Sequence, residues 1–187
     1  MPIGSAPPLR ADVGTIDLAG RGVIAETFPP LTTGGPSLQV SGTLRGGAVG
    51  FAAGTTVSNL TVHVPNTLAG TGMTHCWFMI YNSALALVAQ TADSPAAVQS
   101  AGNVTLALTS ALSVTASGLF YLCFLATTGT TMPNLSSGAN NANLVNYGAA
   151  IGSGAPSIIA QTGLAALPNP VVPAAGVANS CPWIAAS

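Results

Sequence analysis

Two apolar runs decide the fold: CWFMIY at residues 76–81 and LFYLCFL at residues 119–125. Every side chain in them is apolar or aromatic, so a strand built from either run buries both of its faces. Both runs are far shorter than the roughly 20 apolar residues of a membrane-spanning helix. We therefore expect them to be central strands of a packed sandwich, or strands at a subunit interface.

Other segments alternate between apolar and polar residues, with the period of two that marks a half-buried strand. This pattern holds at residues 60–64 and 104–109. Further strands are expected at residues 38–44, 48–52, 85–91, 112–115, 142–149 and 157–162, separated by Gly, Pro and Asn turns. About eight strands at this spacing predict an all-β, antiparallel β-sandwich that is jelly-roll-like.

One short helix is expected between two of the strands, over residues 94–101. Ser94 suits the N-cap, Pro95 suits the first helical position, and Gly102 suits the end. The pattern predicts a two-turn connector between the sheets.

The chain is expected to fold as one sandwich domain at residues 37–166, flanked by two arms. Residues 1–36 are rich in proline and carry most of the charged side chains, which favours an extended arm that contacts a partner over a solvated tail. Residues 167–187 are again rich in proline and predict an irregular C-terminal arm. The arm residues expected to bind a partner are Arg10, Asp12, Asp17, Arg21, Glu26, Phe28 and Trp183.

The low charge content argues against several classes of function. Only 4% of the residues are charged, none is lysine, and Asp93 is the only charged residue after Arg45. Ordinary domains are roughly a quarter charged. Catalysis relies on ionisable groups, so we expect no enzyme and no cofactor. Without basic clusters, neither nucleic acid nor an anionic membrane is an expected partner.

Few residues of the β region could carry chemistry. Asp93 with His63 or His75 is its only acid–base pairing, and no Gly-x-Ser-x-Gly elbow supplies a nucleophile, so a hydrolase is disfavoured. A zinc site drawn from these residues and Cys76 is also disfavoured, because neighbours on a strand point to opposite faces. Asp93 is most simply a turn residue before the expected helix.

The three cysteines, Cys76, Cys123 and Cys181, are expected to be buried and reduced. A Cys76–Cys123 bridge stays open if their strands are neighbours. The first residues lack the basic start and apolar stretch of a secretory signal, which favours assembly in a host cytoplasm.

Three stretches together resemble β-rich virion proteins of tailed bacteriophages: MIYNSALALVAQTAD at residues 79–93, GNVTLALT at 102–109 and LSVTASGLFYL at 112–122. In that family a strand ending in an aromatic residue, Asn or Asp, and Ser leads through a turn to a leucine- and threonine-rich strand. This chain departs from the pattern at residues 82–84, NSA, where a glycine turn is usual. The resemblance covers roughly residues 75–135. It implies a head decoration protein, head fibre or tail component, and no catalytic residues.

The expected function is a structural virion protein that decorates the capsid and binds the major capsid protein or other virion subunits through its arm. We expect a homo-oligomer, because a sandwich so poor in charge would expose apolar patches as a monomer. A trimer is favoured over a dimer or an asymmetric lattice contact. The alternative is a receptor- or carbohydrate-binding module of a fibre or tail, with a hydrolytic enzyme as a distant third.

Two features would argue for the carbohydrate-binding alternative. The polar loop at residues 134–146 is rich in asparagine, whose amide both donates and accepts hydrogen bonds. An exposed Trp77 or Trp183 in a concave site would supply the aromatic platform of a sugar site and reverse the order of the two functions.

Overall fold

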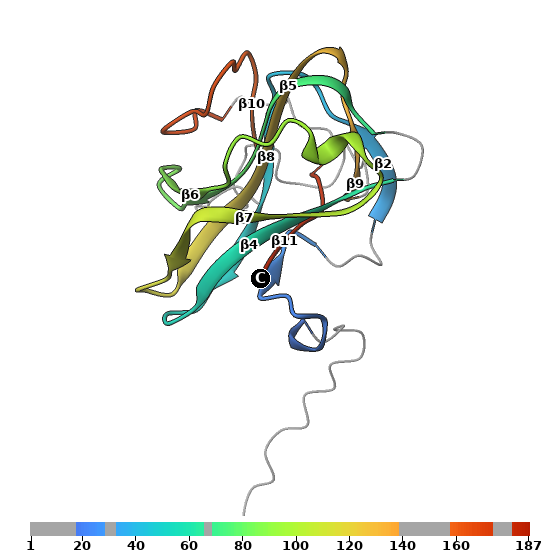
Figure 1. Ribbon diagram of the computed structural model, residues 1–187. Coiled ribbons are helices and arrows are strands. Elements are labelled where there is room, and N and C mark those ends of the chain that lie inside the picture. The colour runs from blue at the N-terminus through green and yellow to red at the C-terminus, as the bar shows by residue number, and fades with distance from the viewer. Residues whose placement is uncertain (1–17, 29–32, 66–68, 139–157, 174–180) are drawn as a thin grey trace, which may run out of the picture.

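The computed structural model describes residues 18–28, 33–65, 69–138, 158–173 and 181–187. It is an all-β antiparallel sandwich, as predicted, with two main sheets and a two-stranded ladder (Figure 1). The four-stranded sheet has the order β1 (Ala25–Glu26), β11 (Ile184–Ala186), β4 (Thr56–Val64), β7 (Gly102–Ser113). The five-stranded sheet has the order β10 (Ile158–Gln161), β3 (Leu44–Phe51), β8 (Gly118–Thr131), β5 (Thr71–Asn82), β6 (Leu87–Gln90). The ladder pairs β2 (Thr33–Leu38) with β9 (Asn134–Gly138).

The path of the chain crosses between the two main sheets. Strands β3, β4 and β5 alternate between them, and β8 returns to lie between β3 and β5. Such long-range returns are typical of Greek-key and jelly-roll sandwiches. Most contacts within the sandwich therefore join segments that are distant in sequence.

The two apolar runs form the centre of the five-stranded sheet, as expected for strands buried on both faces. Phe78 and Phe124 lie opposite each other on β5 and β8 and point into the core between the sheets. Met79 and Leu125 belong to a second cluster, on the other face of this sheet. All four side chains are fully buried. The segment after β10 covers this outer face with Leu164 and Leu167, together with Val171.

The strand expected at residues 38–44 is instead a turn between β2 and β3, and β3 begins earlier than the expected residue 48. Glycines account for both differences. Gly42 adopts a φ of +67°, and a Cβ there would lie 2.6 Å from the carbonyl oxygen of Leu164. Gly46 faces Cys123 across the ladder so closely that a side chain at this position would overlap its sulfur.

The expected two-turn helix at residues 94–101 is only a 3-10 turn, η3 (Ala97–Gln99). Ser94 does not cap it, because its hydroxyl donates to the Ala92 carbonyl oxygen at 3.2 Å. Val98 is buried in the core between the sheets, and its carbonyl accepts a hydrogen bond from the Gly70 amide at 3.0 Å. Packing of this one side chain takes precedence over the local helix signals.

The terminal segments also differ from the expectation of two arms outside residues 37–166. Residues Ile184–Ala186 are not irregular, because they form β11 between β1 and β4, and Figure 1 shows the C-terminus within this sheet. Strand β1 pairs with β11 and contributes the buried Ala25 to the core. Most of the polar loop expected from residue 134, and the strand expected at 142–149, lie outside the described residues, while Asn134–Gly138 form β9.

Candidate functional site

The outer face of the four-stranded sheet carries many polar side chains. On β4, Leu60 and Val62 point into the core, so Thr61 and His63 point outward. The strand register places Thr61 opposite Thr105 of β7, and His63 opposite Asn103. Because apolar and polar residues alternate along β4, one face of the strand packs into the apolar core and the other presents polar side chains.

A groove of about 390 Å³ lies over this face, and we call it the Trp183 groove. The short helix η1 (Ala19–Arg21) and the two residues after it form one wall, and β11, β4 and β7 form the rest. Its lining residues are Arg21, Gly22, Val23, Thr61, Asn103, Thr105, Trp183, Ala185 and Ser187.

A hydrogen-bonded trio holds one end of the groove. Arg21 Nη2 donates to Glu26 Oε1 at 2.7 Å, and Trp183 Nε1 donates to Glu26 Oε2 at 3.0 Å. The Glu26 side chain is only 7% exposed, so its ion pair is better shielded from water than a surface pair. The Trp183 amide also donates to the Ser136 carbonyl oxygen at 2.7 Å. Both ends of Trp183 are thereby anchored.

The structure brings together three of the arm residues expected to bind a partner: Arg21, Glu26 and Trp183. Phe28 does not line the groove; its ring lies against Gly138 of β9. The other three, Arg10, Asp12 and Asp17, lie outside the described residues.

Sequence reasoning missed the groove residues Thr61, Asn103 and Thr105. Their signal in the sequence is that they occupy the polar positions of strands in which apolar and polar residues alternate. Such positions face away from the core. That pattern shows which side chains share a face, but not that η1 and β11 build a wall beside them.

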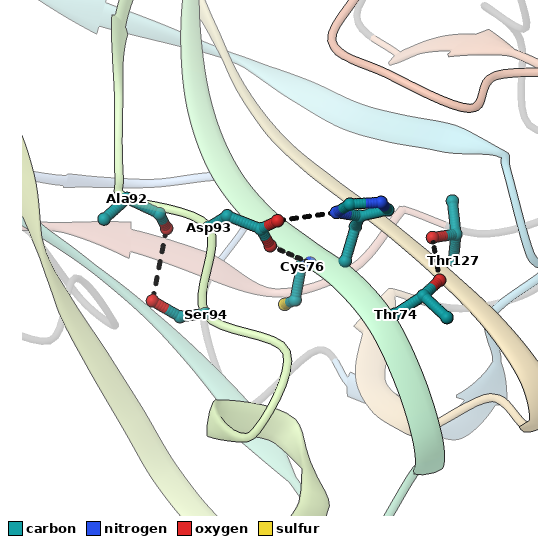
Figure 2. Close-up of polar contacts among 7 residues, drawn as sticks. Thr74, Cys76, Ala92, Asp93, Ser94 and Thr127 are labelled. Carbon is teal, nitrogen blue, oxygen red and sulfur yellow. Dashed lines mark hydrogen bonds and ion pairs between the residues drawn. The ribbon is translucent and has the colours of Figure 1, made fainter.

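A second polar cluster joins β5 to the segment after β6 (Figure 2). His75 Nδ1 and Asp93 Oδ2 are 2.6 Å apart, and Asp93 Oδ1 accepts a hydrogen bond from the Cys76 amide at 2.9 Å. The His75 ring stacks on Trp77 with centroids 4.9 Å apart and an interplanar angle of 7°. Of the two acid–base pairings considered from the sequence, the structure therefore forms the one with His75.

Among the described residues, no hydroxyl is shown to complete a hydrolytic triad with the His75–Asp93 pair. A nucleophilic hydroxyl would have to bond the other ring nitrogen of His75. The nearby hydroxyls drawn in Figure 2 bond elsewhere: Thr74 with Thr127 at 2.7 Å, and Ser94 with the Ala92 carbonyl. The carboxylate instead fastens the β6–β7 connection to β5, which is a structural role.

The zinc site considered from the sequence is not assembled. His63 lies on the four-stranded sheet and bonds Ser136 Oγ at 2.7 Å, whereas His75 lies on β5 of the other sheet and Asp93 lies in the β6–β7 connection. The Cys76 thiol points into the core, opposite to His75, as expected for neighbours on a strand. Within the described ranges, no three His, Cys, Asp or Glu residues gather where they could hold a metal ion.

The cysteines are free and buried, as expected. Cys76 belongs to the core between the sheets, whereas Cys123 belongs to the cluster on the outer face of the five-stranded sheet. Although β5 and β8 are neighbours, these thiols point to opposite faces and cannot form a bridge. Burial raises the pKa of the Cys76 and Cys181 thiols to about 12.

Trp77 does not supply an aromatic platform, since it is only 9% exposed. Trp183 is half-buried and lines a concave site. No described helix is long and apolar enough to cross a membrane. Comparison with known proteins finds neither a family model nor a curated protein that matches the sequence.

Proposed function

We propose that the chain is a non-enzymatic structural protein of a tailed-bacteriophage particle, which decorates the assembled capsid as a homo-oligomer. The observation that supports this proposal is that the few charged side chains of the described residues are paired or buried within the fold. In the described part of the chain, Arg21 pairs with Glu26, and Asp93 holds His75 and the Cys76 amide. Arg45 is only 7% exposed, and burial lowers its pKa.

The surface that remains for association is therefore dominated by neutral groups. Among the described residues, large apolar side chains are exposed in three places on the sandwich. One is Ile24, directly before β1. Leu38 and Val40, 58% and 49% exposed, flank the buried Gln39 where β2 leads into the turn before β3. Val88 lies on β6, and Val172, 66% exposed, follows a segment that hydrogen-bonds to Leu85. Contacts through such groups are driven by apolar burial and hydrogen bonds, as in permanent assemblies.

Attachment to the capsid is proposed for the residues before η1, which include Arg10, Asp12 and Asp17. The β1 portion of the expected arm is already engaged in the sandwich through its pairing with β11. Arg45 is buried and bonds the Leu38 carbonyl oxygen at 3.4 Å, so it is a poor candidate for contact with a partner.

Sedimentation velocity of the full chain tests the assembly part of this proposal. We expect an oligomer that persists from about 0.05 to 1 M NaCl, since screening weakens exposed charge pairs but not apolar contacts. The double variant Leu38→Ser, Val40→Ser should shift the population toward monomer, whereas Ala53→Ser, at an exposed turn, should not. A wild-type protein that stays monomeric at micromolar concentration would contradict the proposal.

Cryo-electron microscopy of the particles encoded with this chain tests the location. Density for the sandwich on the outer capsid surface is expected, and the protein should stay on the particles in 1 M NaCl. Its absence from purified particles, or its release by moderate salt, would show that the proposed role is wrong.

A second candidate function is a receptor- or carbohydrate-binding module of a fibre or tail. The position of Trp183 in a groove beside amide and hydroxyl groups favours it. Because its ring is half-buried rather than exposed, we keep the structural role first. Surface decoration and ligand binding are compatible, since they use different parts of the sandwich.

A further inference from the structure

We propose that the Trp183 groove binds a neutral saccharide, with the indole of Trp183 as the surface on which one sugar ring packs. This inference does not depend on the capsid-decoration role, because every lining residue that the structure describes belongs to one chain. Its volume of about 390 Å³ lies at the lower end of the range of about 300–1,000 Å³ for small-molecule sites.

The aromatic part of the site is held in place before any ligand arrives. The indole N–H is bonded to Glu26 and the Trp183 amide to Ser136, so the ring cannot turn without breaking a hydrogen bond. The face of an indole carries negative potential, which suits the C–H groups on the apolar face of a pyranose. A fixed ring also loses little conformational entropy on binding.

The hydroxyl and amide groups of the groove match the other edges of a sugar. Thr61 Oγ1 and Thr105 Oγ1 are 2.8 Å apart, and each hydroxyl still has an acceptor site beyond this bond. Asn103 is exposed two residues before Thr105, on the same face of β7, and offers both a donor and an acceptor. Mixed donors and acceptors at neighbouring positions suit the adjacent hydroxyls of a hexose.

The charges of the groove favour a neutral ligand over an anionic one. Among the described lining residues, Arg21 is the only cationic one, and Glu26 already pairs with it at 2.7 Å. An acidic sugar placed beside this guanidinium would be repelled by the nearby Glu26 carboxylate. A neutral sugar needs no opposite charge and can bond the hydroxyl and amide groups of the lining.

Titration followed by tryptophan fluorescence tests the site in the full chain. In the Trp77→Phe variant, Trp183 is the only tryptophan and therefore the source of the tryptophan fluorescence. Probes are tetrasaccharides of glucose, galactose, mannose and N-acetylglucosamine, with sialyllactose as the anionic comparison. We expect saturable quenching by at least one neutral probe and a weaker response to sialyllactose. No saturation by any neutral probe up to about 10 mM, a concentration that corresponds to a binding free energy of about 2.7 kcal/mol, would overturn the proposal.

Variants then locate the binding by isothermal titration calorimetry. Trp183→Ala should abolish it. Asn103→Ala and Thr105→Ala, at exposed positions that should not impair folding, should each weaken affinity by about three- to tenfold, as expected for one lost hydrogen bond. Ser110→Ala, exposed on the same strand but outside the groove, is the matched control and should bind as the wild type. Unchanged affinity in Asn103→Ala and Thr105→Ala would place the saccharide elsewhere and overturn the assignment.

Discussion

The two sheets of the sandwich use the same charge-poor sequence in different ways. The five-stranded sheet is buried on both faces, because the core lies on one side and the segment carrying Leu164 and Leu167 covers the other. The four-stranded sheet buries only one face and presents Thr61, Asn103 and Thr105 on the other. The first sheet therefore contributes two buried faces to stability, whereas the second contributes one and leaves the other free to carry a binding surface. Five predictions test this division.

The largest effect should come from removing β11. Deletion of residues 183–187 takes away the strand between β1 and β4, so β1 loses its partner in the sheet and one edge of β4 is left unpaired. We expect loss of the cooperative thermal transition in circular dichroism. Ile184→Val, which keeps the strand, should cost only about 0.5–1.5 kcal/mol. A truncated chain that still melts cooperatively near the wild-type temperature would show that β11 is a dispensable arm after all.

Among the proposed single substitutions, Phe124→Ala should lower the free energy of unfolding the most. Its ring is fully buried between the sheets and lies 5.9 Å from the ring of Phe78. The cavity left behind should lower the free energy of unfolding by about 3–5 kcal/mol, measured by urea denaturation. A cost below about 1 kcal/mol would mean that the core between the sheets is loosely packed.

Alkaline pH should destabilise the protein through its buried thiols. The folded Cys76 and Cys181 thiols have pKa values raised to about 12, above the ordinary 9.0 of the unfolded chain. Thiols of the unfolded chain thus ionise first, and stability should fall as pH rises from about 9 to about 12. Urea midpoints across this range measure it, and Cys181→Ala should flatten the slope. At pH 8, Ellman's reagent should label the cysteines only in denaturant.

Tyr81→Phe probes the segment at residues 162–173, which forms a cover over the outer face of the five-stranded sheet. The Tyr81 hydroxyl donates to the Pro168 carbonyl oxygen at 2.9 Å. Its loss should cost about 0.5–1.5 kcal/mol in urea denaturation. The same variant should speed proteolysis within residues 162–173, whereas Leu87→Val, a small change on β6, should not. Equal cleavage of both variants would mean that this hydrogen bond does not hold the cover.

Thr105→Ala should have the smallest effect on stability, within about 0.5 kcal/mol, because the side chain is exposed. This small change contrasts with the loss of saccharide affinity expected for the same variant. A destabilisation above about 2 kcal/mol would show that the polar face is structural, and the contrast between the two sheets would disappear.

The sequence by itself determined the fold class and which strands lie at the centre. Residues 76–81 and 119–125 are apolar at every position, and only a strand covered on both faces satisfies that composition. The alternation at 60–64 likewise assigned Thr61 and His63 to the outer face before any partner strand was known. These properties are local, since a period of two is enough to separate the faces of a strand.

Only the tertiary structure decided which segments pair and where the groove lies. Strands β1 and β11 are too short to show a period, and their positions depend on partners far along the chain. The same holds for Val98, whose burial replaced the expected helix with a single turn. Arg21, Glu26 and Trp183 meet for this reason as well: about 160 residues separate the two segments, and only the pairing of β1 with β11 brings them together.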